Sequence, residues 1–389
     1  MSQDEGQKSS PIFISLIPHL MGGEGHIIPY HQAVNQAIKK IGWQHNIIIP
    51  TDHNLNNIPS QWCECLSPYD LEAEGNGWQK ILRIQQTWEL SITIVNYLRN
   101  KVINQSDLSI IFLERFIHLQ LLALVIALYL VPTKNLSVWL LYRRDTHKDK
   151  TKFIYKWLNN LVKKRLSKGR FKLLTDSDLL GQSLSNYFEE SVIVMPIPHT
   201  DIDCYSMSIT ENDDIVCWWP GSPREEKGWE VINNLVNSDV KLTQNICLIA
   251  SEKSKLEVPE NGLKVKLVED NLSRDKYHSW FCLTNIILLP YDAEAYGERT
   301  SGIFTESIIA GKISLVTPNT WMAYELLKYN LSELVIDWQE GQKVFDIVIK
   351  VSKSPIIKDK IKAMQTSYQQ FHCLDNYGCM IQKIIKEMV

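Results

Sequence analysis

Residues 285–318 read NIILLPYDAEAYGERTSGIFTESIIAGKISLVTP, and this stretch decides the fold. Two short apolar runs, 285–290 and 313–318, flank a polar loop and a helix-length segment. Short buried strands that alternate with helices are typical of a parallel sheet covered on both faces. The stretch therefore predicts a strand, a loop, a helix and a second strand parallel to the first.

The same alternation extends outward in both directions. Further strands are expected at 11–17, 46–50, 108–113, 136–142, 171–175, 191–198, 215–219, 245–250 and 263–268. Helices are expected at 29–41, 78–103, 116–131 and 148–167, from about Pro223, and over 354–388, with a long polar loop at 51–77. This order predicts an α/β protein with two Rossmann-like domains facing each other across a cleft.

The domain limits follow from where the pattern changes. Residues 1–10 are polar and are expected to be disordered. We expect the first domain at 11–200 and the second at 201–370, because the alternation restarts after a polar, acidic stretch. Residues 371–389 are expected to form a C-terminal helix that crosses back to the first domain.

The composition excludes several classes of protein. The chain has 389 residues, 44% of them hydrophobic, and a net charge of −3, which gives no argument for a nucleic-acid partner. The eight cysteines are scattered, so we expect free thiols in a reducing, cytoplasmic compartment. The N-terminus has no signal-peptide pattern, and the apolar run 116–131 is too short to span a bilayer.

Three segments resemble the retaining glycosyltransferases of family 4, which have the GT-B fold. They are LIPHLMGGEGHIIPYH (16–31), PGSPREEKGW (220–229) and YGERTSGIFTESIIAGK (296–312). They are similar to the family's glycine-rich loop after the first strand, its G-x-x-R-x-x-K-G segment and its Glu-x7-Glu segment. The resemblance implies sugar transfer from a nucleoside-diphosphate sugar, with the first domain binding the acceptor and the second the donor.

Arg224 and Lys227 are the candidate phosphate-binding cations. Negative charge grows on the leaving diphosphate during sugar transfer, so positive charge placed beside it favours the reaction. The two residues are three positions apart at the start of an expected helix, hence on one face. The alternative is a solvated first helical turn, in which acidic side chains are favoured by the helix dipole.

Ser301, Gly302 and Ile303 lie where a loop enters a helix. Backbone N–H groups at such a point bind anions, and a glycine permits close approach of a diphosphate. The alternative role is capping of the helix by Thr300 or Ser301.

Two glutamates frame this segment. The resemblance implies that Glu298 contacts the donor sugar and that Glu306 accepts hydrogen bonds from the ribose hydroxyls. The sequence departs from the family between them, because Arg299, Thr300 and Ser301 replace its Gly-aromatic-Gly. Arg299 is therefore a candidate for an additional phosphate or sugar contact.

The glycine-rich loop after the first expected strand holds Gly22, Gly23 and His26. The glycines would allow close approach of donor or acceptor to the backbone, and His26 is a candidate proton relay or acceptor-orienting group. The spacing does not fit a nicotinamide-binding loop. His31 is expected to be a hydrogen-bonded core histidine.

Arg143, Arg144 and Asp145 follow an expected strand at its carboxyl end, where α/β sheets bind ligands. A solvated loop is an equal alternative. Asp176 and Asp178 form a D-x-D pattern, which would suit a metal-dependent transferase, but helix capping by an acid is the simpler explanation. No essential metal and no cofactor beside the sugar nucleotide are expected.

The segment 143–172 carries twelve Lys and Arg against two Asp. Apolar residues repeat at helical spacing within it: Phe153, Ile154, Trp157, Leu158, Leu161, Val162 and Leu166. We expect this stripe to pack on the sheet. The alternative is peripheral contact of 148–167 with an anionic inner membrane surface, which would suit a lipid-linked acceptor.

The sequence thus predicts a cytoplasmic glycosyltransferase, a hexosyltransferase of polysaccharide or glycolipid biosynthesis, that uses a nucleotide-sugar donor and an acceptor hydroxyl. A non-catalytic GT-B-like scaffold and a metal-dependent transferase using Asp176 and Asp178 are the alternatives.

Overall fold

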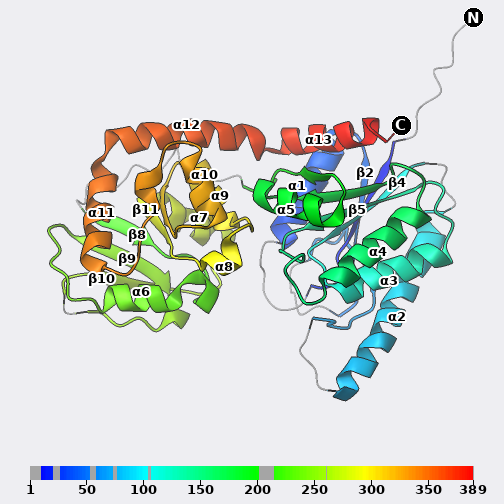
Figure 1. Ribbon diagram of the computed structural model, residues 1–389, viewed down its shortest axis with the longest axis horizontal. Coiled ribbons are helices and arrows are strands. Elements are labelled where there is room, and N and C mark those ends of the chain that lie inside the picture. Colours follow the sequence, from blue (N-terminus) through cyan, green and yellow to red (C-terminus); the bar gives the residue numbers. More distant parts are fainter. Residues whose placement is uncertain are drawn as a thin grey trace, which may run out of the picture. The chain divides into compact units, whose positions relative to one another are not determined.

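The computed structural model describes residues 10–20, 27–52, 58–72, 77–103, 107–200, 214–259 and 261–388. The chain divides into two compact units, one comprising Met1–His199 with Leu374–Val389 and the other Thr200–Cys373. Figure 1 shows the helices and strands of both units, and each is described by itself below.

The first unit is built on a seven-stranded parallel sheet in the order β3-β2-β1-β4-β5-β6-β7. Its strands are β1 (Ile12–Leu16), β2 (Gln44–Pro50), β3 (Cys63–Leu66), β4 (Ser109–Glu114), β5 (Leu136–Tyr142), β6 (Phe171–Thr175) and β7 (Val192–Val194). Its helices are α1 (Ile27–Lys40), α2 (Gly77–Lys101), α3 (His118–Leu130), α4 (Lys152–Arg165), α5 (Asp178–Phe188) and α13 (Leu374–Lys386).

Both faces of the central strands of this sheet are buried, which explains the consecutive apolar residues in them. Successive side chains of a strand point to opposite faces. In β1, Ile12 and Ile14 join the core formed with α2, α3 and α4, while Phe13 joins the core formed with α1 and α13 (Figure 1). The sequence therefore needs apolar residues at consecutive positions, rather than at alternate ones.

The second unit is built on a five-stranded parallel sheet in the order β10-β9-β8-β11-β12. Its strands are β8 (Ile215–Trp218), β9 (Ile246–Ser251), β10 (Lys264–Val268), β11 (Ile286–Leu289) and β12 (Ile313–Val316). Its helices are α6 (Trp229–Val236), α7 (Arg274–Leu283), α8 (Ala293–Tyr296), α9 (Gly302–Ile309), α10 (Trp321–Leu327), α11 (Gly341–Lys353) and α12 (Pro355–Phe371), with short 3₁₀ turns η1 (Glu225–Lys227), η2 (Glu252–Ser254) and η3 (Ser332–Leu334).

The strand order reverses once in each sheet. In the first unit the chain leaves β1 toward β2 on one side and returns to β4 on the other. In the second unit β8 lies between β9 and β11 in the same manner. Parallel α/β sheets bind ligands beside such points, at the carboxyl ends of the strands.

Two expectations about local structure are wrong. The stretch 51–77 contains the edge strand β3, which pairs in parallel with β2. The helix expected from Pro223 is a 3₁₀ turn followed by α6. The helices expected over 354–388 are present: α12 ends at Phe371, and α13 belongs to the first unit.

The apolar stripe of α4 divides into two parts. Tyr155, Leu158 and Val162 are buried against the sheet, whereas Phe153 is 66% and Trp157 55% exposed. The expectation that both aromatic residues pack on the sheet is therefore wrong.

The cysteines and the helices bear on two other expectations. Six described cysteines are free thiols, but Cys282 in α7 is disulfide-bonded, so the expectation of unpaired cysteines is wrong there. Among the described residues, no helix combines the length and the apolarity needed to cross a bilayer.

Candidate active site

The candidate site lies at the carboxyl edge of the second sheet, around the ends of β8 and β11. The segment 220–229 leaves β8 and the segment 290–309 leaves β11, and the two strands are neighbours in the sheet. The strand order reverses at this pair, so both segments emerge at the place where parallel sheets bind ligands.

Two glycines allow the segment after β8 to fold against the segment after β11. Gly228 has φ +77°, and a Cβ added there would lie 2.1 Å from the carbonyl oxygen of Pro290. Gly221 has φ +89°, and a Cβ added there would lie 2.9 Å from Nζ of Lys227. Glycine is required at Gly228 by the close packing on the Pro290 backbone, and at both positions by the positive φ.

Further bonds fix the η1 turn. The indole of Trp219 donates a hydrogen bond to the carbonyl of Lys227 at 3.0 Å. The backbone N–H of Asp292 donates to the carbonyl of Glu226 at 3.0 Å. The backbone that carries Lys227 is therefore held from β8 and from the start of α8.

Lys227 is a partly buried cation without an ion-pair partner among the described residues. Its Nζ lies 5.9 Å from the centre of the buried Tyr291 ring. Burial and the neighbouring Arg224 lower the pKa of Lys227 to about 8, against weaker opposing effects of Glu226 and Asp270. A negatively charged ligand would relieve both unfavourable effects.

Arg224 differs from Lys227 in exposure. Its side chain is about half exposed, and its Nη1 lies 3.0 Å from Oε1 of Glu226. It precedes the η1 turn instead of lying on a regular helix, so the expectation of one shared helical face is wrong. The two cations are nevertheless close enough for Arg224 to depress the pKa of Lys227, after the larger effect of burial.

The first turn of α9 faces the same region. Ser301 caps the helix, since its Oγ accepts a hydrogen bond from the N–H of Phe304 at 3.2 Å. A Cβ on Gly221 would lie 3.7 Å from Cδ1 of Ile303, which places the two predicted segments in contact. A Cβ on Gly302 would meet no atom within 4 Å, so the backbone there is open to a ligand.

Glu306 lies in α9 and is bound by a residue that sequence reasoning missed. The hydroxyl of Tyr277, from α7, donates to Oε2 of Glu306 at 2.6 Å. Burial raises the pKa of Glu306 to about 7, and this hydrogen bond opposes the rise. Tyr277 is 29 residues away in the sequence, so no local motif could have paired the two.

Glu298 and Arg299 lie in the turn between α8 and α9, and both are partly exposed. The guanidinium of Arg299 lies over the Tyr296 ring at 5.0 Å from its centre. The Tyr296 and Tyr291 rings are in turn 4.5 Å apart. A chain of aromatic rings thus leads from Arg299 to Lys227.

Asp270 is a second group that the sequence did not reveal. It follows β10 and accepts hydrogen bonds from Ser251 at 2.8 Å and from Lys253 at 2.6 Å. Ser222, in the loop after β8, contacts it at 3.4 Å. This polar cluster extends the carboxyl edge of the sheet away from β11 and lowers the pKa of Asp270 in spite of partial burial.

The remaining candidates belong to the first unit. Gly22, Gly23 and His26 lie outside the described residues. His31 is buried, with Nδ1 3.1 Å from Oγ of Ser15 and Nε2 3.1 Å from Oε2 of Glu114.

The D-x-D aspartates are committed to protein partners. Oδ2 of Asp176 lies 3.3 Å from Nε of the largely buried Arg143. Ser177, not an acid as expected, caps α5. Among the described residues, no group of three or more His, Cys, Asp or Glu side chains could hold a metal ion.

Comparisons with known proteins bear on the fold. No protein-family model matches the chain, and no curated protein matches it. Solved structures do: a glycosyltransferase from Rickettsia africae (TM-score 0.64, 12% identity, 97% of this chain and 98% of that one) and the sucrose-phosphate synthase of Thermosynechococcus elongatus (0.63, 11%, 98% and 99%). The Anabaena protein HepE, solved with UDP, is also similar (0.62, 11%, 97% and 100%).

The chain has the GT-B fold. The matches extend over nearly the full length of both chains and include both sheets. The predicted α/β class and the predicted likeness to GT-B glycosyltransferases are confirmed at the level of the fold. Membership of family 4 stays a prediction.

Proposed function

We propose that the chain is a glycosyltransferase that moves a sugar from a nucleoside-diphosphate sugar to an acceptor hydroxyl. One observation carries the proposal: a partly buried lysine without a counter-ion among the described residues, an arginine and the open first turn of α9 meet at the reversal point of the second sheet. This combination suits the pyrophosphate of a sugar nucleotide.

The site would act mainly through electrostatics. The bond from the anomeric carbon to the phosphate oxygen breaks, and charge accumulates on the leaving diphosphate. Lys227 is placed to act as the buried point charge and Arg224 as the exposed fork, while the N–H groups of Gly302 and Ile303 supply neutral donors. Because Lys227 is already desolvated, it needs little reorganisation when the charge develops.

The glutamates would hold the two sugars of the donor. Glu306, anchored by Tyr277, is the proposed acceptor for the ribose hydroxyls, since a carboxylate can accept from two neighbouring hydroxyls. Glu298 is the proposed contact for the transferred sugar, with Arg299 as an additional polar contact. These two assignments rest on the family resemblance and on their position beside α9.

We propose retention of the anomeric configuration, on the same resemblance. The acceptor oxygen would attack on the face that the diphosphate leaves and form the new glycosidic bond. Its proton would pass to a phosphate oxygen of the departing nucleotide. No metal and no cofactor beyond the sugar nucleotide is invoked, and the pairing of Asp176 with Arg143 does not favour the metal-dependent alternative.

Thermal unfolding in the presence of nucleotide sugars tests the donor assignment. UDP and UDP-glucose are the first probes, because a structural neighbour was solved with each. Binding should raise the unfolding temperature of the full chain, and transfer to water or an acceptor should release UDP. Absence of binding by any nucleotide sugar would favour the scaffold alternative.

Two lysines form a matched pair for this test. Lys227 and Lys312 are both largely buried with pKa values lowered to about 8 by burial. Lys312 donates to the carbonyl of Cys282 at 2.9 Å and has no place in the proposed site. Lys227→Met should slow sugar transfer about a hundredfold, whereas Lys312→Met should leave the rate per folded molecule unchanged. Equal rates in both variants would refute the site.

A second proposal concerns α4. Phe153 and Trp157 are exposed one turn apart on a helix whose lysines include Lys152, Lys156 and Lys163. Exposed aromatic residues among basic side chains suit the interface of an anionic membrane. We expect the chain to sediment with phosphatidylglycerol vesicles and not with pure phosphatidylcholine. Phe153→Ala with Trp157→Ala should abolish this, while unchanged sedimentation would contradict membrane contact through α4.

A further inference from the structure

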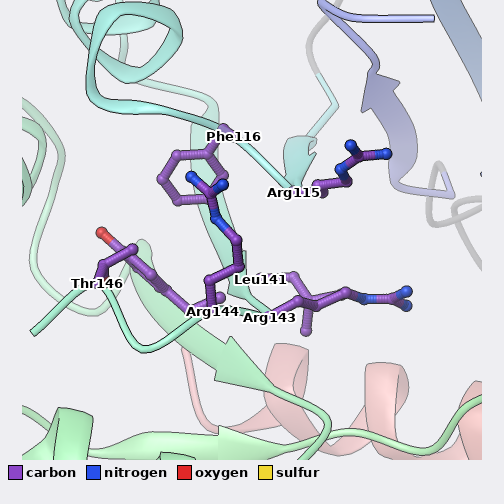
Figure 2. Close-up of a pocket in the computed structure, with 7 residues that line it drawn as sticks. Arg115, Phe116, Leu141, Arg143, Arg144 and Thr146 are labelled. Carbon is purple, nitrogen blue, oxygen red and sulfur yellow. The ribbon is translucent and has the colours of Figure 1, made fainter. Parts of the chain in front are cut away.

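A small pocket lies at the carboxyl edge of the first sheet, where β4 and β5 end (Figure 2). Arg115 follows β4 directly, and Arg143 and Arg144 follow β5 directly. The two strands pair in parallel with Glu114 opposite Leu141, so these arginines emerge side by side. The proposed donor site uses none of them, although this edge of an α/β sheet is a usual place for ligands.

A buried hydroxyl without a partner lines this pocket. Thr146 is 2% exposed, and its Oγ1 has no hydrogen-bond partner among the residues that the structure describes. An unsatisfied buried hydroxyl costs free energy that a ligand atom could recover. Phe116, Leu141 and Tyr142 supply apolar walls beside it.

Arg144 lies two residues before this threonine and lines the same pocket. It is exposed and makes no ion pair within the described part of the protein. Figure 2 shows its guanidinium standing toward Phe116, on the same side of the backbone as Thr146. Burial raises the pKa of Tyr155, and the charge of Arg144 together with a hydrogen bond from its guanidinium opposes that rise, so the guanidinium lies beside Tyr155 in the first turn of α4.

Figure 2 shows the side chains of Arg115 and Arg143 extending away from Thr146. Arg143 is bound by Glu114 and Asp176 and is thereby neutralised. Arg115 lies 3.9 Å from Glu72 and has φ 45°, a conformation that a residue with a side chain adopts only at a cost. Such strain is concentrated at ligand sites. Arg115 and Arg143 each have an acidic partner. Among the pocket's arginines and its threonine, Arg144 and Thr146 are therefore the two side chains proposed to contact a ligand.

We propose that this pocket binds an anionic group, a phosphate or a carboxylate, carried by the acceptor; the assignment to the acceptor rests on the proposed sugar transfer. The pocket is small and open to solvent, so it can take a single anionic group and not a whole disaccharide. A planar guanidinium and a hydroxyl donor are complementary to its oxygens. The apolar wall would contact the adjoining carbon skeleton.

Calorimetric titration of the full chain with inorganic phosphate, in saturating UDP, tests the site. The UDP keeps phosphate out of the donor site. Wild type should bind phosphate, and Arg144→Ala and Thr146→Val should each weaken binding, by about tenfold for the arginine. Lys163→Ala is the matched control, because Lys163 is an exposed cation at the far end of α4, paired with Glu190. It should bind phosphate as wild type does.

Two further probes identify the carrier of the anion. Glucose 6-phosphate binding more tightly than inorganic phosphate indicates a soluble acceptor. Arg144-dependent capture by phosphatidic acid vesicles, in a chain that already carries Phe153→Ala and Trp157→Ala, indicates a lipid. No phosphate binding by wild type, or equal binding by Arg144→Ala, overturns the proposal even where UDP binds. A wild-type chain that binds phosphate but not UDP would contradict the proposed donor site and not the anion site.

Discussion

Both units bury ionisable side chains at the carboxyl edge of a parallel sheet, but they neutralise them differently. In the first unit His31, Glu114, Arg143 and Asp176 form a continuous chain of contacts between 3.1 and 3.4 Å. In the second unit Lys227 and Glu306 are partly buried, with no opposite charge in contact among the described residues. The charges of the first set neutralise one another, whereas those of the second set would be neutralised only by a bound ligand.

The pKa values follow this difference. Burial lowers the pKa of Arg143, but Glu114 and Asp176 outweigh it and raise that pKa above its usual range. Burial dominates at Lys227, where the pKa falls to about 8, and at Glu306, where it rises to about 7. Perturbed groups without compensating charges are typical of functional sites, and ion-pair networks of structural ones.

The largest expected effect is in the first unit. Glu114→Gln removes the carboxylate that contacts both His31 and Arg143. It leaves His31 and Arg143 without their shared carboxylate, and breaking a buried ion pair costs about 3–5 kcal/mol. The free energy of unfolding should fall by that amount in urea denaturation of the full chain. Glu189→Gln is the control, because Glu189 is an exposed residue paired with Lys156, and its loss should cost less than about 1 kcal/mol.

The corresponding substitution in the second unit, Glu306→Gln, should raise the free energy of unfolding instead of lowering it. Glu306 has a pKa of about 7, against 4.5 in the unfolded chain, so its contribution to stability is present below pH 4.5 and is lost as the pH rises through about 7. Glu306→Gln cannot ionise and should be about 1–3 kcal/mol more stable than wild type at pH 8. UDP affinity should nevertheless fall about tenfold, because charge-assisted hydrogen bonds are lost.

Urea denaturation and calorimetry with UDP measure the two quantities on the same preparation. Tyr277→Phe separates the roles, since it removes the donor to Glu306 and leaves the carboxylate in place. It should reduce affinity less than Glu306→Gln does. If Glu306→Gln lost stability as Glu114→Gln does and kept its UDP affinity, Glu306 would be structural and the contrast between the units would disappear.

Most of the strands could be predicted because they are short apolar runs separated by polar segments, and the central ones are buried on both faces. β5 and β6 have the bounds expected at 136–142 and 171–175. β3 was missed because it has four residues, CECL, and lies within a polar, turn-rich stretch, so no run of apolar residues marks it. The helix expected at Pro223 failed because Gly221 and Gly228 turn the backbone there.

The site was predictable only where its residues are close in sequence. Ser301, Gly302 and Ile303 lie together at the start of α9, and the glycine spacing around Lys227 reflects close packing that only glycine permits. Tyr277 and Asp270 were missed because they are distant from the site's motifs in the sequence. The order of the strands in the sheet brings α7 and the end of β10 close to the site. Burial of Lys227, which sets its pKa, likewise depends on contacts across that sheet.

The smallest expected effect is the pH dependence of donor binding, which tests both buried groups at once. Glu306 can accept from both ribose hydroxyls, with charge-assisted hydrogen bonds, only when it is ionised, so affinity should rise as the pH passes about 7. Lys227 attracts phosphate only when protonated, so affinity should fall as the pH passes about 8. UDP-glucose is the proper probe, because its phosphates, unlike a terminal phosphate with a pKa near 6, do not titrate in this range.

The profile should therefore be a shallow bell, with affinity about threefold lower at pH 6.5 and at pH 8.5 than between pH 7 and 8. Glu306→Gln should remove the acidic limb and keep the alkaline one, and Lys227→Met should do the reverse. Lys312→Met should retain both limbs, although Lys312 shares the lowered pKa of about 8. If the affinity of the wild-type chain for UDP-glucose were constant from pH 6 to 9, neither Glu306 nor Lys227 would contact the donor. The two units would then differ only in how far their ionisable side chains are paired with opposite charges.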